Sequence, residues 1–438
     1  MDFQKKGWLK RYLYLRNNYA LIKEYDRLVN MEKDSVSPEN LLYELLQPSG
    51  LLYGHPAQIP IVYKSLLRAL RADKLSDKDK TKIILTESFL NSGLISPRYR
   101  EINQKVDVAD ALLESAIHIG KFYHSLYPLS IGASKRGLFR REMKGLELSE
   151  NLIDQRVEKK SGEQKFWKEF FRSSLFFLDV VHFGRWLHAH KNKKEGEKIL
   201  EDHQKDRLLA FKIIVAAAYA NQILEPEEKV LLQNYLAVAQ FDEKTNKHAL
   251  KIIDSGVNLT SLKLGKIDSP TMKRHLMELA ILTVCADRDV NEEEEVFLEQ
   301  LRARLHLEKE LFNSSEVAVE SFLLENWQKL AHQQDDNRVN HLGKQLQKRI
   351  HELIMYDELA FKEAINKNPV LQKLLLKMQH EKLSAENRTR IRQELIAVIN
   401  GLPSLSGIAL PRTFLTFPRL MEIFPGDYFI QMQDQPPK

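Results

Sequence analysis

The sequence predicts an all-α protein, and two features of its composition indicate this fold class. Leu, Lys, Glu, Ala and Gln dominate, while runs of β-branched residues are few. Glycine is scarce, with 17 residues in 438. We therefore expect multi-helix bundles, a central helical domain with an internal repeat, and short proline-punctuated helices near the C-terminal end.

Three regions follow from a pass along the chain. Residues 1–165 read as short helices with a basic loop at 130–145. Residues 166–310 hold an aromatic helix and then a repeated helical unit. Residues 311–438 form a C-terminal helical region that includes a proline-rich segment at 383–425.

The bulk properties limit where the protein acts. Charged residues make up 29 % of the chain and the net charge is +6, so contact with nucleic acid or membrane must come from local patches. The single cysteine, Cys285, indicates a reducing compartment. We see no secretion signal and no uncharged stretch of 18 residues, so we expect a cytoplasmic protein, at most peripheral to the inner membrane.

The helix expected at 166–190 is apolar around most of its circumference, which predicts burial among other helices. Asp179 and His182 lie three residues apart on it and share a face. They fit either a buried hydrogen bond between the two side chains or, less commonly, a pair of metal ligands.

An internal repeat relates residues 208–236 to residues 274–302 at a constant offset of 66. Each copy reads as an apolar helix, a tight polar turn and a second helix with an acidic start. Pro226 suits the first helical position of its copy. Asn291 and Glu294 have the spacing of a capping box.

The turn of the second copy is strongly acidic, with seven carboxylates between residues 287 and 299. Two interpretations stay open. Acidic residues at a helix start stabilise the helix dipole. Alternatively, Asp287, Asp289 and Glu293 could hold a hard divalent cation through oxygen ligands. We expect no other cofactor.

Catalytic signatures are absent from the sequence. The segment at 351–355 is one histidine short of the zinc-protease pattern, and there is no GxSxG, GxGxxG or GK[ST] motif. Cys285 reads as a small core residue. We therefore expect that the protein is not an enzyme.

The C-terminal region is basic and ends in a segment rich in proline. Residues 344–392 hold eleven Lys or Arg against six Asp or Glu. Ser384 is a good N-cap for a helix that stops before Pro403. Prolines then recur with spacings of 8, 7 and 7, so a continuous helix is impossible there. Those prolines are Pro403, Pro411, Pro418 and Pro425.

Two resemblances to known families follow from these segments. The repeat with its ADRDVNEEEE turn resembles the TerB-like domain of tellurite-resistance proteins, which implies a compact helical domain with an acidic surface that can bind metal. The segment from residue 383 to 425 resembles the core of the LETM family of mitochondrial proteins and their bacterial relatives. In that family it adjoins the membrane and leads into a ribosome-binding domain. Together the two resemble bacterial LETM-related, biofilm-associated proteins, and we expect no long downstream domain here.

Two functional hypotheses follow from the resemblance and the basic residues. The first is a non-enzymatic adaptor that docks on a protein partner or a large anionic partner, with the ribosome implied by the LETM family. The second is a peripheral membrane or envelope protein that binds anionic lipid through the same segment. A third alternative is purely structural, with the proline segment packed as a clasp. DNA is not an expected partner. We expect Arg388, Arg392, Arg412 and Arg419 to make the contacts and the four prolines to set the shape.

Overall fold

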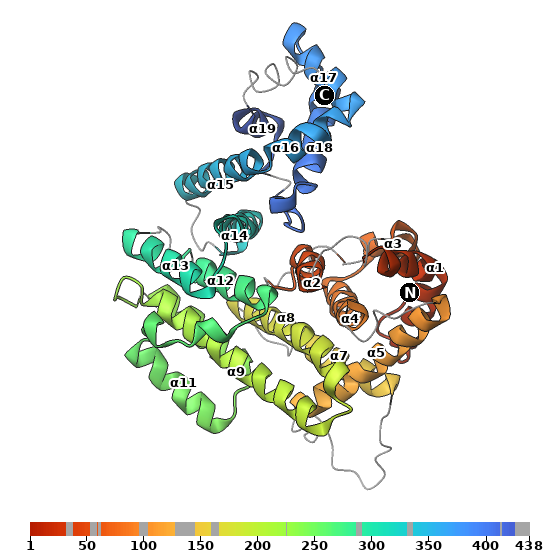
Figure 1. Cartoon of the computed structure of the whole chain (residues 1–438), viewed down its shortest axis with the longest axis vertical. Helices are drawn as coiled ribbons and strands as arrows, with labels where there is room; N and C mark the ends of the chain where they lie inside the picture. The colour runs from red at the N-terminus through yellow and green to blue at the C-terminus, as the bar shows by residue number, and fades with distance from the viewer. Residues whose placement is uncertain are drawn as a thin grey trace. The chain divides into compact units, whose positions relative to one another are not determined.

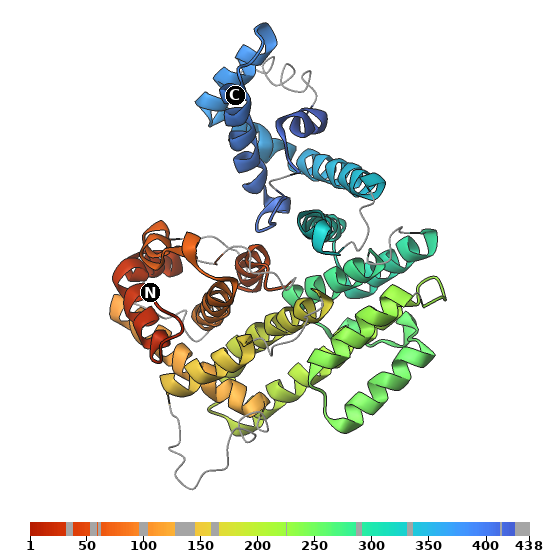
Figure 2. The same ribbon diagram turned by 180° about the vertical axis from the view of Figure 1, so that it is seen from behind.

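All regular secondary structure is helical in the part of the chain that the structure, a computed structural model, describes (Figures 1 and 2). That part comprises residues 1–31, 38–52, 59, 63–95, 104–127, 145–158, 166–224, 226–285, 291–330, 336–411 and 414–424. Over these ranges there is no β-strand, which confirms the all-α class. No helix within them is long and apolar enough to cross a bilayer.

The described chain divides into two compact units. The N-terminal unit comprises Met1–Lys212, Val230–Ser255 and Ser269–Met272, and the C-terminal unit comprises Ile213–Lys229, Gly256–Asp268 and Lys273–Lys438. The three domains expected from the sequence stay a prediction.

The N-terminal unit is built around α4 (Asp77–Ile95), whose residues 82–95 are all buried. Helix α4 packs against α2, α5, α7 and α8, and α1 packs against α3, α5 and α7. The bounds are α1 (Trp8–Met31), α2 (Pro38–Leu46), α3 (Lys64–Leu70), α5 (Lys105–Leu126), α7 (Leu146–Val157), α8 (Phe166–Ala189), α9 (Lys193–Ala218), α10 (Pro226–Ala239) and α11 (Glu243–Ser255).

Helices α5 and α7 approach closely at Gly120. A Cβ atom there would lie 2.7 Å from the backbone nitrogen of Ser149, which is closer than real Cβ atoms come. Instead, the Gly120 amide donates to the Ser149 hydroxyl at 2.8 Å. The missing side chain therefore sets the distance between the two helices.

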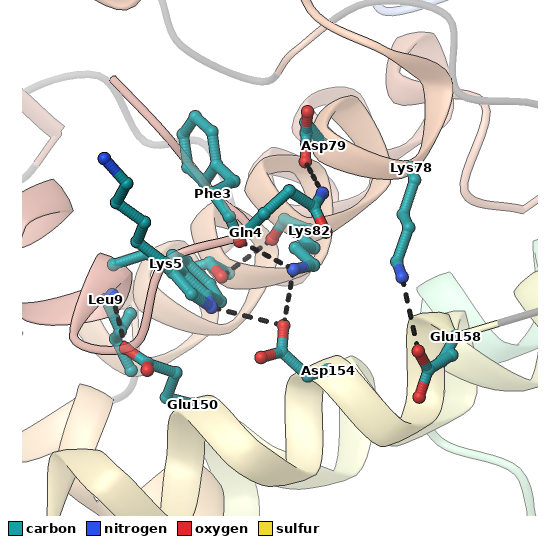
Figure 3. A network of polar contacts seen from close by, with 12 residues as sticks. Phe3, Gln4, Lys5, Leu9, Lys78, Asp79, Lys82, Glu150, Asp154 and Glu158 are labelled. Atoms are coloured by element: carbon teal, nitrogen blue, oxygen red, sulfur yellow. Dashed lines mark hydrogen bonds and ion pairs between the residues drawn. The ribbon is translucent and has the colours of Figure 1, made fainter.

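Polar contacts hold the start of the chain against α4 and α7 (Figure 3). The Glu150 carboxylate on α7 accepts from two backbone amides at the start of α1, of which that of Leu9 is 2.8 Å away. Such amides have no partner inside their own helix. Lys82 on α4 donates to the Phe3 carbonyl at 2.8 Å and pairs with Asp154 on α7 at 2.6 Å.

A second polar cluster lies inside the same unit. Arg16 on α1, only 1 % exposed, pairs with Glu87 at 2.8 Å and with Glu24 at 3.2 Å. Tyr12 donates its hydroxyl to Glu87 at 2.5 Å, and Tyr63 donates to Glu24 at 2.8 Å. Both carboxylates are buried, so the guanidinium and the hydroxyl groups replace the water that they would have bound.

The C-terminal unit continues the chain from α12 onwards. Helix α14 packs on α15, α17 packs on α18, and α19 packs on both α15 and α18. The bounds are α12 (Pro270–Val284), α13 (Glu292–Leu305), α14 (Lys309–Leu330), α15 (Asp336–Tyr356), α16 (Glu358–Asn366), α17 (Pro369–His380), α18 (Ala385–Asn400) and α19 (Phe417–Ile423), with a 3-10 turn, η6, at Pro403–Leu405.

The helix bounds confirm the internal repeat and its offset of 66. Helix α9 ends at Ala218 and α12 at Val284, while α10 begins at Pro226 and α13 at Glu292. The correspondence extends past the motif found in the sequence. Gln240 and His306, again 66 apart, both end their helices in the left-handed conformation, with φ of 50° and 51°.

Candidate functional site

The proline segment folds back as short pieces onto α15, α16 and α18. Pro403 opens η6 and is exposed, while Pro411 is buried. Pro418 is exposed in the first turn of α19, where its missing N–H costs nothing. Pro425 lies outside the described residues.

The apolar side chains between the prolines form a core. Leu405, Leu415 and Leu420 are fully buried. Phe424 stacks on Phe361 of α16, with ring centroids 4.9 Å apart and planes within 7°. Each fully buried leucine contributes about 1.5–3 kcal/mol relative to an exposed one. The segment therefore packs against its own unit, as the structural alternative required.

Polar contacts fasten this clasp, residues 402–424, at both ends. The backbone amide and hydroxyl of Ser404 donate to the Asp357 carboxylate at 2.8 Å and 2.6 Å. At the far end His351 Nδ1 donates to the Ile423 carbonyl at 3.0 Å. Outside the clasp the partners are Asp357, which lies between α15 and α16, and His351, which lies in the C-terminal part of α15.

The four arginines expected to make contacts have different surroundings. Arg392 is half-buried and donates from Nε to the Leu415 carbonyl at 2.7 Å. Arg419 is also half-buried and donates from Nη1 to the Gln347 side chain at 2.9 Å. Both hold the clasp. Arg388 is exposed, and Arg412 lies outside the described residues.

Helices α17 and α18 pack against each other, and they and the turn between them carry exposed cations. We call Lys373, Lys377, Lys382, Arg388 and Arg390 the α17–α18 basic surface. Between residues 369 and 392 there are six Lys or Arg and two Glu, and α17 itself has no carboxylate. Such a surface attracts phosphate-rich partners.

The start of α18 is as the sequence predicts. The Ser384 hydroxyl accepts from the backbone amide of Asn387 at 3.2 Å, and the helix ends at Asn400. This fixes the direction in which α18 presents Arg388 and Arg390 from its first turns.

The acidic turn confirms the helix-start chemistry. Asn291 accepts from the Glu294 amide and the Glu294 carboxylate accepts from the Asn291 amide, both at 2.9 Å. Glu293 is exposed on the first turn of α13. Asp287 and Asp289 lie outside the described residues. Within the described part of the chain no three His, Cys, Asp or Glu side chains are grouped to hold a metal ion.

The sequence reasoning missed a buried carboxylate pair on α14. Glu316 and Glu320 both pair with Arg349 of α15, at 2.5 Å and 2.9 Å. Burial raises the pKa of each carboxyl to about 7, against the opposing effect of Arg349. Desolvation and these carboxylates raise the pKa of the Cys285 thiol, which therefore stays protonated. The signal in the sequence was two glutamates four residues apart in an apolar helix.

The expected hydrogen bond between Asp179 and His182 was wrong, although both residues are buried. His182 Nε2 instead bonds to Asp206 of α9 at 2.9 Å. Asp179 accepts from His203 of α9 and from Arg156 of α7, both at 2.9 Å. The partners come from neighbouring helices, since α9 brings His203 and Asp206 and α7 brings Arg156 within hydrogen-bond distance of these two side chains.

These partners fix the charges of the cluster. Burial acts to raise the pKa of Asp179, but Arg156 and the hydrogen bond from His203 lower it to about 2. Burial lowers the pKa of His203 to about 4, despite the opposing effect of Asp179. At neutral pH the cluster therefore holds a carboxylate beside a neutral imidazole.

Comparisons of the chain with protein-family models, with curated proteins and with solved structures found no match.

Proposed function

We propose that the protein is a non-enzymatic helical adaptor that docks on a large anionic partner through the α17–α18 basic surface. The observation that carries this proposal is the exposure of five cations on two packed helices and the turn between them, namely Lys373, Lys377, Lys382, Arg388 and Arg390. The ribosome is the partner that the LETM resemblance implies, since its surface is rich in RNA phosphates. The TerB-like repeat and the N-terminal helices serve as the scaffold.

The arginines of this region differ in their contacts, and this difference makes the proposal more specific. Arg392 donates a hydrogen bond to the Leu415 carbonyl and Arg419 donates one to Gln347, so both stabilise the clasp. Arg388 donates only a 3.3 Å bond from Nε to the Leu383 carbonyl among the contacts described, and its side chain is exposed. Partner contact is therefore assigned to Arg388 and Arg390 before the others.

Co-sedimentation with purified ribosomes over a salt series tests the proposal. We expect pelleting at low salt and its steep loss as salt rises, because phosphate binding releases counterions. Arg388→Glu/Arg390→Glu should abolish pelleting at low salt. The matched control is Lys193→Glu/Lys194→Glu, which changes the net charge equally at exposed sites on α9 and should pellet like the wild type. Equal pelleting by the two double variants would refute the assignment.

A second candidate function is binding to an anionic membrane surface. Val370 and Leu376 on α17 are 38 % and 41 % exposed beside Lys373 and Lys377, which is the pattern of an interfacial helix. The clasp itself is a poor membrane contact, because its leucines are buried. Flotation with phosphatidylserine vesicles distinguishes the two, since the ribosome adaptor stays at the bottom of the gradient.

A further inference from the structure

Arg207 on α9 is a fully buried guanidinium with few hydrogen bonds. Its Nη1 donates to the Gln204 side chain at 3.3 Å. Its Nε and Nη2 are buried and have no hydrogen-bond partner in the described chain. A buried donor without a partner costs about 1–3 kcal/mol, and more when charged, so two such donors on one side chain call for a ligand.

The two atoms form the side edge of the guanidinium, which presents two parallel N–H groups. That edge matches two oxygens of one carboxylate or phosphate group and gives a bidentate pair. We propose that Arg207 binds a small oxyanion, a phosphate or a carboxylate, through its Nε–Nη2 edge inside the N-terminal unit. The site is separate from the α17–α18 basic surface.

The local charge supports an anion over a cation. Arg156 and Arg207 both stack on Tyr127, with guanidinium carbons 4.6 Å and 5.7 Å from the ring centroid. Asp179 is the fully buried carboxylate of this cluster, and His203 beside it is neutral at physiological pH. Arg156 and Arg207 outnumber Asp179 by one positive charge, which a monovalent oxyanion neutralises. The further carboxylate nearby, Asp206, is 25 % exposed and bonds to His182.

The segment between α10 and α11 lies over the Arg207 guanidinium. Phe241 is half-buried and covers the Arg207 guanidinium at 5.4 Å. Gln240 before it has φ of 50°, and its side-chain oxygen accepts from Arg156 at 3.1 Å. The Phe241 ring lies over the guanidinium, so we expect an anion to reach Arg207 past this ring.

Isothermal titration of the full-length protein tests the site, with sodium phosphate and sodium acetate as probes and chloride at equal ionic strength as reference. We expect saturable binding of phosphate or acetate with one site per chain, and the stronger of the two identifies the ligand class. Chloride offers one spherical acceptor and should not compete. Absence of saturable binding for both salts would overturn the proposal, because water then satisfies the edge.

Substitutions distinguish the two-donor edge of the Arg207 guanidinium from its positive charge. Arg207→Lys keeps the charge but loses the bidentate edge, and should weaken binding at least tenfold. Arg185→Lys, at an exposed position of α8, is the matched control and should bind like the wild type. Equal affinity of the two variants would contradict the proposal. Should Arg207→Lys fail to fold, Phe241→Ala offers a second test, because it keeps the Nε–Nη2 edge of Arg207. This variant should bind the anion at least threefold faster. An unchanged association rate would contradict access past the Phe241 ring.

Discussion

The two compact units balance their buried charges in opposite ways. In the N-terminal unit Arg16 lies between Glu24 and Glu87. Burial acts to raise the pKa of Glu24, but Arg27 and Arg16 outweigh it, so the pKa of Glu24 is lowered. In the C-terminal unit one guanidinium, Arg349, serves both Glu316 and Glu320, and the pKa of each rises to about 7. A carboxylate with enough cations is a fixed structural charge, whereas a pair that shares one cation takes up protons near neutral pH.

The largest expected effect comes from breaking the balanced cluster. Arg16→Met should lower the free energy of unfolding by about 3–5 kcal/mol, because it leaves two buried carboxylates without their shared cation. Urea denaturation followed by circular dichroism measures the change. Arg388→Met, which removes an exposed arginine, is the control and should stay within about 0.5 kcal/mol of the wild type. A loss below about 1 kcal/mol in Arg16→Met would mean that the cluster does not hold these helices.

The next largest effect is a pH dependence of stability that differs in sign between the two units. Since the folded-state pKa of Glu316 and Glu320 lies above the unfolded value of 4.5, their contribution is fully present below pH 4.5 and is lost as pH rises through about 7. The contribution of His203 runs the other way, present above pH 6.5 and lost as pH falls through about 4.

Glu320→Gln isolates the pH-dependent contribution of this carboxyl group to the free energy of unfolding. Between pH 5 and pH 8 the wild type should lose about 2 kcal/mol relative to this variant, measured by denaturation at each pH. Glu310→Gln, on the same helix, supplies the control for the substitution itself. Parallel stability curves for Glu320→Gln and the wild type would show that the pair does not titrate in this range.

The sequence predicted those features that depend on neighbouring residues. The caps of Ser384 and Asn291 and the helix start at Pro226 need only local backbone geometry, and all three are present. The repeat was visible because its two copies carry the same apolar spacing. The predicted burial of the aromatic helix at 166–190 is also confirmed, because its apolar residues surround the helix axis.

Features that depend on distant partners were not predictable in the same way. Asp179 bonds to residues 23 and 24 positions away on other helices, so the sequence spacing of Asp179 and His182 was misleading. Arg392 reads as a surface cation until the chain folds back and places the Leu415 carbonyl against it. The roles assigned to Arg388, Arg412, the prolines and the acidic turn in binding stay predictions.

The smallest changes in stability give the most direct test of the central claim. That claim is that half-buried arginines of the C-terminal unit hold the clasp and exposed arginines bind the partner. Arg392→Gln should cost about 1–2 kcal/mol of stability, for one charge-assisted hydrogen bond, and leave ribosome binding of the folded protein unchanged. Arg388→Gln/Arg390→Gln should stay within about 0.5 kcal/mol in stability and lower the slope of log affinity against log salt by about 0.7–0.9 per lost phosphate contact. The opposite pattern, with Arg392→Gln weakening binding at full stability and the double variant binding normally, would contradict the account.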